Sequence, residues 1–473
     1  MVIKGAFEKN PVDNPVETVE SYRNTFVNRN SLVRKGVDMS IAANFISAVE
    51  PKRFDDFVKN HPLKSHFMQS VGWGEFNRVE RGMEPHYIGM EDSRGELVAA
   101  AMLLMRKPPV FPPYFYAPRG FVIDFFDREL LGVFTESAVK YCREYGGMFL
   151  KIDPDIELRE IDGNGSPVPG GFDNMALVDT LLELGFRHRG FNLGFDNSQP
   201  RFTFRIDLFD DEAKIKKGIS GTVLKNVRKG ENYSTGLEVG DSGEVKELFR
   251  LISETGERDD FYPYGESYYQ NFYDILQKYD MATLYIGKTY PRKTQKKLEC
   301  QLAETEARAR TLKKDSLIQE AEITAERLRR EISLFSEYAE KYGETAVTNA
   351  HLVVHYGEHA WAVHAGSSGA MKETFLNNRL YLYKILDQKQ KGAVWIDQFG
   401  TVGNPEDSHL KSLHEFKRQF GGRYIEFIGE FDYSLKPIWH FLYDKAMPGY
   451  RSFRLDLRAL LRRMEKKRRR RTE

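Results

Sequence analysis

A short basic run near the middle of the chain could hold a phosphorylated substrate. The segment LKNVRKGENY contains Lys225, Arg228 and Lys229, and such side chains bind pyrophosphate through charge-assisted hydrogen bonds. The same run is also typical of the solvated face of a basic helix. We therefore treat Lys225 and Arg228 as candidate substrate ligands, with a basic helix face as the alternative.

Two adjacent tyrosines, Tyr268 and Tyr269, follow the segment RDDFYPYGE. A tyrosine combines an apolar ring with a polar hydroxyl. One hydroxyl of the pair could therefore contact a nucleotide or a phosphate, while core packing is the alternative role. We expect only one of the two side chains to be exposed.

Four histidines that lie close together in the second half raise the question of a metal site: His351, His355, His359 and His364. Their segment alternates like a strand hairpin, so that His351 and His355 share a face and His364 does not. A catalytic zinc site needs about three converging ligands. We therefore predict no metal site here.

Strand-like and helical segments around these residues occur twice in the same order, which indicates an internal repeat. The first half contains the runs HYIGMED, ELVAAAMLLM and PYFYAP, a helix from about Arg128 to Tyr145, and the strand MFLKID. The second half contains ATLYIG, AHLVVHY and AWAVHAG, a helix around Leu376 to Leu386, and AVWIDQF. Both helices carry apolar residues at helical spacing: Leu131, Phe134, Ala138, Cys142 and Tyr145, and then Leu376, Leu380, Tyr383 and Leu386. This order predicts an α+β fold in which an acetyltransferase-like (GNAT-type) domain is used twice.

A 51-residue stretch from Arg292 to Tyr342, without glycine or proline, separates two strands of the second half. Its apolar positions recur at alternating intervals of three and four residues: Leu298, Leu302, Thr305, Ala309 and Leu312, and then Ile318, Ala321, Ala325, Leu328, Ile332, Phe335 and Ala339. Such spacing is typical of helices that pair along a narrow seam. It predicts an antiparallel coiled-coil hairpin with its two ends at Pro291 and Gly343.

The composition is that of a folded, soluble-type protein, because 41% of the 473 residues are hydrophobic and 13% are aromatic. The longest apolar run, Leu97 to Met105, is far shorter than the roughly 20 residues of a membrane-spanning helix. The N-terminal MVIKGAFEKNP lacks the apolar region of a signal peptide. With only two cysteines, Cys142 and Cys300, both in helical segments, we expect free thiols and a cytoplasmic protein.

The net charge of +1 conceals a basic C-terminal tail from Tyr450 onward. The tail combines Phe453, Leu457, Leu460 and Leu461 with many arginines. Such an amphipathic basic helix could lie on the anionic inner leaflet of the plasma membrane. It could equally bind tRNA or act as a solubilising tail.

Residues from about Met39 to Met447 resemble the FemABX family of aminoacyltransferases. The segments that carry the resemblance are KSHFMQSVGWGEF, YFYAPRGFVID, FLKIDP, ETGERDDFYPYGESYY and LHEFKRQFGGRYIEFIGEFDY, in this order around the predicted hairpin. We divide the chain accordingly into a flexible N-terminal extension (1–38), a first acetyltransferase-like domain (39–205), a second one (206–290 and 343–449), the hairpin inserted into it (291–342), and the basic tail (450–473).

The family attaches amino acids from aminoacyl-tRNA to the side-chain amine of the third stem-peptide residue, or to amino acids already placed there. The resemblance therefore implies an aminoacyltransferase whose partners are aminoacyl-tRNA and lipid II or a UDP-linked muropeptide, without a metal or organic cofactor. Because the tRNA ester is already activated, its aminolysis needs orientation, a carboxylate that accepts the amine proton, and a cation or amide donors for the oxyanion.

Positions that match the family motifs supply candidates for these roles. Asp124, in RGFVID, is the candidate carboxylate, and Arg119 of the same motif is a candidate substrate ligand. Lys417, in EFKRQFGG, is the candidate for stabilising negative charge at the ester or the tRNA 3′ end, with Phe416 as a substrate contact. The alternatives are a turn or helix-capping aspartate and a solvated lysine. Phe121 stands where the family usually has proline.

Two other functions compete with this interpretation. An acyl-coenzyme A N-acyltransferase would need a glycine-rich loop at a strand–helix junction, for which Gly218 and Gly221 are too sparse. A non-catalytic tRNA-binding or assembly protein would use the hairpin and the tail as its binding surfaces. Lys313 and Lys314 could meet tRNA phosphates, but a rigid arm or a dimer contact is an equal alternative for the hairpin.

Overall fold

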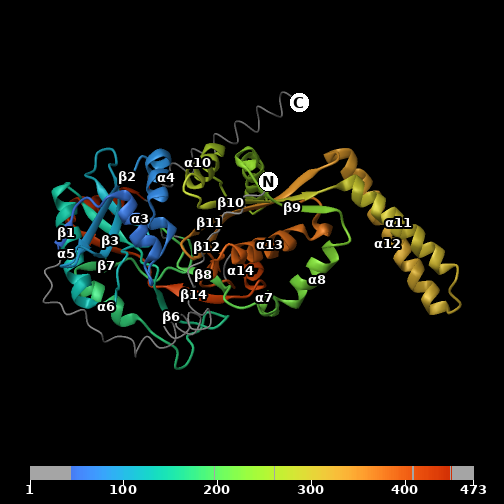
Figure 1. The fold of residues 1–473 in the computed structure, drawn as a ribbon, viewed down its shortest axis with the longest axis horizontal. Helices are drawn as coiled ribbons and strands as arrows, with labels where there is room; N and C mark the ends of the chain where they lie inside the picture. The colour runs from blue at the N-terminus through green and yellow to red at the C-terminus, as the bar shows by residue number, and fades with distance from the viewer. Residues whose placement is uncertain (1–43, 196–197, 260, 407–409, 448, 450–473) are drawn as a thin grey trace, which may run out of the picture.

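The computed structural model describes residues 44–195, 198–259, 261–406, 410–447 and 449 (Figure 1). The predicted N-terminal extension at 1–38 and the basic tail at 450–473 lie outside these residues. Among the described residues, no helix is both long enough and apolar enough to cross a bilayer.

The first half of the chain forms a seven-stranded sheet with the order β1-β2-β3-β4-β5-β15-β7. Its strands are β1 (Asn44–Ile46), β2 (Glu84–Glu91), β3 (Leu97–Arg106), β4 (Tyr114–Ala117), β5 (Phe149–Ile152), β15 (Phe431–Ser434) and β7 (Phe186–His188). The helices of this half are α3 (Pro51–Asn60), α4 (Val71–Arg81), α5 (Arg128–Glu144) and α6 (Met175–Glu183). Helix α5 buries the predicted apolar face, except that Tyr145 follows the helix and is exposed.

The second half forms an eight-stranded sheet with the order β6-β14-β8-β13-β12-β11-β10-β9. Its strands are β6 (Glu157–Glu160), β14 (Arg423–Phe427), β8 (Phe202–Asp207), β13 (Trp395–Asp397), β12 (His359–Ser367), β11 (Ala346–Tyr356), β10 (Ala282–Thr289) and β9 (Thr235–Gly240). Its helices are α7 (Glu212–Gly218), α8 (Gly221–Gly230), α9 (Val245–Asp259), α10 (Glu266–Gln277), α13 (Leu376–Gln390) and α14 (Lys411–Arg418).

The predicted repeat is confirmed by the pairing of the strands. In the first sheet β2, β3 and β4 are antiparallel neighbours, and β5 joins β4 in parallel. In the second sheet β10, β11 and β12 are antiparallel neighbours, and β13 joins β12 in parallel. The strands β5 and β13 therefore hold equivalent places in the two sheets, and each follows the helix of its own half.

Three strands do not follow the predicted division at residue 205. Strands β6 and β8 begin before that residue but pair within the second sheet, whereas β15, which comes near the end of the described chain, lies between β5 and β7 of the first sheet. The two sheets therefore exchange strands. Main-chain hydrogen bonds therefore tie segments from both halves of the chain into each sheet.

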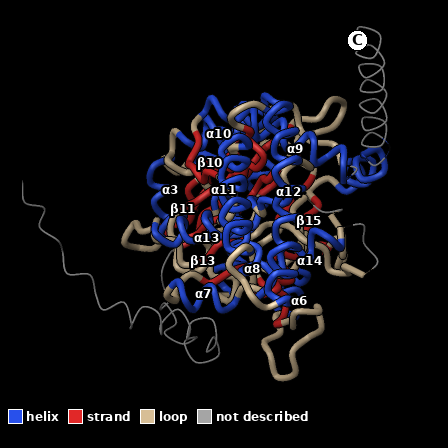
Figure 2. Tube along the Cα trace, turned by 90° about the vertical axis from the view of Figure 1, so that its right-hand side faces the viewer, coloured by secondary structure: helices blue, strands red, loops and turns tan. Residues whose placement is uncertain are grey.

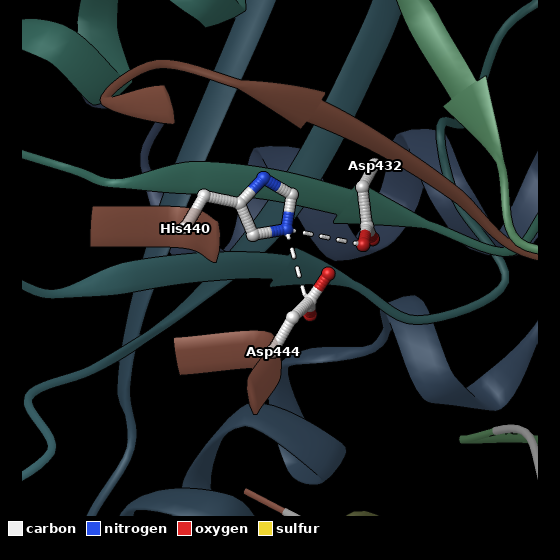
Figure 3. A group of neighbouring side chains, drawn as sticks. All are labelled: Asp432, His440 and Asp444. Carbon is white, nitrogen blue, oxygen red and sulfur yellow. Dashed lines mark ion pairs between the residues drawn. The ribbon is translucent and has the colours of Figure 1, made fainter. Parts of the chain in front are cut away.

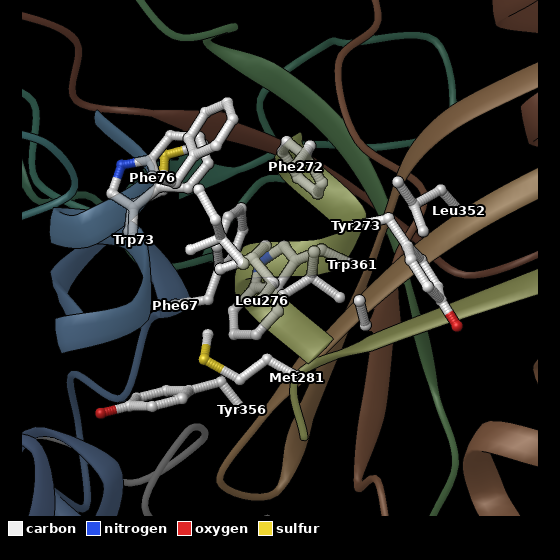
Figure 4. Close-up of a cluster of buried hydrophobic side chains, with 14 of the residues drawn as sticks. Phe67, Trp73, Phe76, Phe272, Tyr273, Leu276, Met281, Leu352, Tyr356 and Trp361 are labelled. Carbon is white, nitrogen blue, oxygen red and sulfur yellow. The ribbon is translucent and has the colours of Figure 1, made fainter. Parts of the chain in front are cut away.

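The largest apolar cluster joins the two halves (Figure 4). Phe67, Trp73 and Phe76 come from the first half, and Phe272 and Trp361 come from the second. Rings of the two groups meet edge to face, with centroids 5.1 Å apart for Phe76 and Phe272. Because the interface between the halves is itself a hydrophobic core, a site between them has rigid walls.

The predicted hairpin is confirmed and projects from the second half, as Figure 1 shows. It consists of α11 (Pro291–Ala309) and α12 (Asp315–Tyr342), which lie side by side when the molecule is viewed from the hairpin's side (Figure 2). Proline at the first position of α11 and Gly343 after α12, with φ +74°, mark its two ends. The seam buries Leu298, Leu328 and Phe335 beside the ring of Tyr233 from the domain.

Candidate active site

A small cavity opens where the carboxyl-terminal ends of β5 and β13 meet. Its lining comes from both halves of the chain: His66, Arg119, Asp155, Pro200, Phe202, Thr203, Trp361, Asp397, Phe399, Gly400 and Phe427. Two of these residues, Arg119 and Phe399, have left-handed backbone conformations, with φ +54° and +58°. Such conformations are uncommon for non-glycine residues, and residues that adopt them cluster at functional sites. Because both halves of the chain line this cavity and two of its residues have this backbone conformation, we treat it as the candidate active site.

Two carboxylates in the cavity wall share one arginine. Arg205 of β8 places its Nη2 atom 3.3 Å from Asp155 Oδ1 and 3.3 Å from Asp397 Oδ2. Burial acts to raise the pKa of Asp155, but Arg205 and neighbouring cations hold it well below its usual range. Asp397 also accepts hydrogen bonds from the Thr203 hydroxyl and, at 2.7 Å, from the Phe399 amide. The wall therefore places two carboxylates beside one guanidinium group, and hydrogen bonds hold Asp397 in this arrangement.

Arg119 is buried at the first-half side of the cavity. Its amide donates to Asp153 Oδ1 at 2.7 Å, and its Nη2 donates to the carbonyl of Pro200 at 2.8 Å. Asp153 also accepts a hydrogen bond from the Tyr116 hydroxyl, at 2.7 Å. Burial raises the pKa of Asp153 to about 7, although Arg119 opposes the rise. Asp153 is therefore a carboxyl group that can gain or lose a proton near neutral pH.

Lys417 lies directly behind the cavity wall. Its Nζ donates to the carbonyl oxygens of Phe399 and Gly400, both at 2.7 Å. Burial lowers the pKa of this amine to about 8, while the carboxylate of Asp397 acts to raise it. The alternative of a solvated lysine is therefore wrong, because the side chain is buried.

A second lysine, Lys384 of α13, lies in the same region. It is fully buried, and its Nζ lies 3.3 Å from the centroid of the Tyr381 ring. Burial and the neighbouring Lys417 hold the pKa of Lys384 well below its usual range. Phe416 packs against Tyr381 and Phe420, with ring centroids 5.2 Å apart in both pairs. The ring of Phe416 thus supports the helix that carries Lys417.

Asp124 lies on the segment between β4 and α5, beside the cavity rather than in its lining. Its Oδ1 accepts a hydrogen bond from the Phe126 amide at 2.9 Å, which is the geometry of a turn. The next residue, Phe125, has Lys64 Nζ 5.6 Å from its ring centroid, and Lys64 donates in turn to the carbonyl of Asp155. The segment that carries Asp124 is therefore connected to the cavity wall.

The other predicted ligands lie elsewhere. Lys225 and Arg228 are exposed on α8, as both a ligand role and a basic helix face require. Tyr268 and Tyr269 are both buried in the cluster that joins the halves, so the expectation that one would be exposed is wrong. Both rings pack edge-on against His364, and burial raises the pKa of Tyr269 to about 12. Of the predicted residues, Arg119 thus lines the cavity and Lys417 lies behind its wall, whereas these four residues lie outside the lining.

Three of the charged residues of the wall were missed by the motif search: Asp155, Arg205 and Asp397. The repeat contains a signal for one of them, Asp397, and for the neighbouring Asp153, because the equivalent strands FLKID and VWID both end in aspartate. Since these strands hold equivalent places in the two sheets, their terminal aspartates could have been paired as site candidates. Nothing in the sequence near Arg205 indicates its partners.

A second group of titratable residues lies in the first sheet (Figure 3). His440 Nε2 is 3.4 Å from Asp432 Oδ2 and 3.8 Å from Asp444 Oδ1. The three side chains are close enough to invite a metal interpretation, but cations already pair with both carboxylates. Lys151 Nζ is 2.8 Å from Asp432, and Arg189 Nη1 is 2.8 Å from Asp444. The donor set fits an ion-pair network better than a metal centre.

The four histidines of the second half do not converge on one point. His351 Nε2 lies 3.1 Å from the Asn377 side-chain oxygen, and His359 Nδ1 lies 3.1 Å from the carbonyl of Ser65. Burial lowers the pKa of His364 to about 4. Within the part of the chain that the structure describes, these histidines do not contribute to any group of three close ligands.

The fold and the cavity define a class: an acyl-transferring enzyme built from two acetyltransferase-like domains, with a coiled-coil hairpin inserted in the second. Residues 49–446 match the model of the FemAB family, and the chain belongs to this family. A lipid II:glycine glycyltransferase of Staphylococcus aureus (strain USA300) is 27% identical over 428 residues, covering 86% of this chain and 97% of that protein. The crystal structure of FemX matches with a TM-score of 0.68 at 25% identity, covering 85% of this chain and 99% of that one.

Proposed function

We propose that this chain transfers an amino acid from aminoacyl-tRNA to the stem-peptide side-chain amine, or to a bridge already begun, on a peptidoglycan precursor. Family membership makes it a transferase of peptidoglycan bridge synthesis. The name of the staphylococcal relative states a glycyl transfer to lipid II, and this chain spans 97% of that relative. The tRNA donor and the choice between lipid II and a UDP-linked acceptor belong to the proposal.

The buried Lys417 amine is the observation that carries the proposed chemistry. In the reaction, the acceptor amine nitrogen attacks the ester carbonyl carbon, and the bond from that carbon to the tRNA ribose oxygen then breaks. The departing ribose oxygen takes a proton, and the attacking nitrogen loses one. A lysine whose pKa is about 8 is charged in much of the population at neutral pH and can stabilise the oxyanion of the tetrahedral intermediate.

Asp124 is the proposed carboxylate that accepts or steers the amine proton. It lies on the same segment as Arg119, which lines the cavity, and a hydrogen bond from the Phe126 amide fixes its orientation. Arg119, Phe416, Lys225, Arg228, Tyr268 and Tyr269 stay proposed substrate contacts. The last two are buried in the cluster that joins the halves, so neither offers an exposed hydroxyl for such a contact.

The test is transfer of radiolabelled amino acids from a mixed pool of charged bacterial tRNA to lipid-linked and UDP-linked muropeptides. Asp124→Asn and Lys417→Met proteins are compared with Lys411→Met, which removes an exposed lysine from the same helix. Label that enters a muropeptide with wild-type protein and with Lys411→Met, but not with the other two, supports the proposal. Binding of charged tRNA without transfer to any acceptor would replace it with a binding function.

A further inference from the structure

The last described helix, residues 437–447, is attached to the first sheet by its polar side. The His440 ring stacks on Phe149 with centroids 4.4 Å apart, and Asp444 pairs with Arg187 and Arg189 at 2.9 and 2.8 Å. The Tyr443 ring also packs against Phe149, at 5.6 Å. The ion-pair network of Figure 3 therefore anchors this helix to the body.

The opposite side of the same helix is apolar and faces solvent. Ile438 is 75% exposed, Phe441 is 59% exposed, and Leu442 is exposed beside them. At 100° per residue these three lie on one face, opposite His440 and Asp444. The amphipathicity is thus the reverse of that expected for a surface helix of a soluble protein, in which the apolar stripe packs on the core.

A neighbouring loop extends this surface. Val110, between β3 and β4, is 87% exposed. The next residue, Phe111, packs edge-on against Trp439 and Tyr443, with centroids 6.3 and 5.4 Å apart. The loop and the helix are therefore side by side. We call Val110, Ile438, Trp439, Phe441 and Leu442 together the apolar face.

Positively charged side chains lie beside the apolar face. Lys107 is exposed at the base of the loop, and Lys445 is exposed on the helix with its Nζ 5.7 Å from the Phe441 ring centroid. The sequence that continues from the helix, residues 450–473, contains eleven basic and three acidic residues. Exposed Trp, Phe and Leu side chains with lysine and arginine beside them suit a bilayer with anionic headgroups.

We propose that the apolar face docks this protein on the surface of an anionic lipid bilayer, with its apolar side chains in the headgroup region and the lysines among the phosphates. A nucleic acid is a poor occupant, because its phosphates would leave the apolar side chains in water. A second copy of the chain would bring the same basic residues together. This inference goes beyond the proposed transfer, and it is tested without any transfer assay.

The protein carries its own reporter for this docking. Of its four tryptophans, Trp73, Trp361 and Trp395 are buried, whereas Trp439 of the apolar face is 42% exposed. The full-length protein is mixed with vesicles of phosphatidylglycerol and phosphatidylcholine whose acyl chains carry bromine, and with vesicles of phosphatidylcholine alone. We expect bromine to quench the exposed tryptophan with the anionic vesicles and much less with the neutral ones. The quenching should disappear in Trp439→Phe.

The matched variants are Ile438→Ser/Phe441→Ser/Leu442→Ser and the control Ile323→Ser, which changes a side chain that is 64% exposed on the hairpin. The triple variant should lose at least about tenfold in vesicle affinity by co-sedimentation, and the control should bind like wild type. All the substituted side chains are exposed, and unchanged thermal unfolding verifies the fold. The proposal is wrong if wild type does not bind, if it binds without quenching, or if the triple variant binds equally well. It is also wrong if ultracentrifugation shows a dimer that the triple variant abolishes.

Discussion

Two groups of charged side chains lie in different parts of the molecule: one lies beside the first sheet, at β15 and the helix that follows it, and the other lies on α13 and α14. In the first sheet, Asp432, His440 and Asp444 meet Lys151, Arg187 and Arg189, which we call the Asp432 network. Behind the cavity, Lys384 and Lys417 form the lysine pair, whose amines meet an aromatic ring and two carbonyl oxygens rather than a carboxylate. Charge is compensated in the first group and largely uncompensated in the second.

The pKa values follow this difference. Burial acts to raise the pKa of Asp432, but Lys151 and the other cations hold it at about 2. The pKa of Lys151 is raised by Asp432 and Glu430 in spite of burial. In the lysine pair, burial lowers both pKa values, that of Lys417 to about 8. The pair of Asp432 and Lys151 keeps its charges at every physiological pH, whereas an uncompensated amine can change its charge during a reaction.

Removing the Lys417 amine should give the largest change in the transfer rate. Lys417→Met keeps the length of the side chain and its packing, and we expect kcat to fall by about 10²–10³-fold, as for loss of one oxyanion donor. The free energy of unfolding should change little, because the variant removes a buried charge that lacks a carboxylate partner but also leaves the Phe399 and Gly400 carbonyls without their donor. Single-turnover transfer and urea unfolding measure the two effects. If the variant is slow only because it unfolds, Lys417 has no role in the mechanism.

The pH dependence of the transfer rate should report the titration of the Lys417 amine. Since burial lowers the pKa of Lys417 to about 8, the amine is charged below that pH and neutral above it. If the cation stabilises the oxyanion, the rate should fall about tenfold per pH unit above about 8. Lys417→Arg keeps a cation at all these pH values, so its slower reaction should lack this falling limb. If the rate of the arginine variant still falls above about pH 8, a titratable group other than Lys417 causes the fall.

The Asp397→Asn variant should still transfer, but its rate should begin to fall at a lower pH than that of wild type. The Asp397 carboxylate raises the pKa of Lys417 against the effect of burial, so its neutralisation should shift the falling limb below pH 8. Near pH 8 the rate should be about three- to tenfold lower than in wild type. Asparagine can still accept the hydrogen bond from the Phe399 amide. A rate loss of equal size at every pH would indicate that Asp397 only holds the loop.

The sequence predicted the parts of the fold that have local signals. The apolar spacing from Leu298 to Ala339 predicted the hairpin, and the repeated order of strands and helix predicted the two sheets. The exchange of strands could not be predicted, because β6 and β15 have four residues each and pair with strands far away in sequence. The same limit applies to the cavity. Arg205 joins Asp155 and Asp397 only after β8 has paired with β13.

A substitution in the Asp432 network should cause the smallest change in the transfer rate and a large change in the free energy of unfolding. Asp432→Asn leaves Lys151 and Arg189 with less negative charge, and breaking a buried pair costs about 3–5 kcal/mol. We expect the free energy of unfolding to fall by about that amount, while kcat of the folded protein stays within about twofold of wild type.

The pH dependence of that loss follows from the lowered pKa of Asp432. A carboxyl group whose folded pKa lies below its ordinary 3.8 stabilises the fold above that pH, and this stability is lost as pH falls toward 2. The stability difference between wild type and Asp432→Asn should therefore be full at pH 7 and shrink below pH 4. Urea unfolding across this range, with transfer measured at pH 7, tests both points. If kcat falls strongly while the protein stays folded, the compensated network takes part in catalysis and the contrast with the lysine pair does not hold.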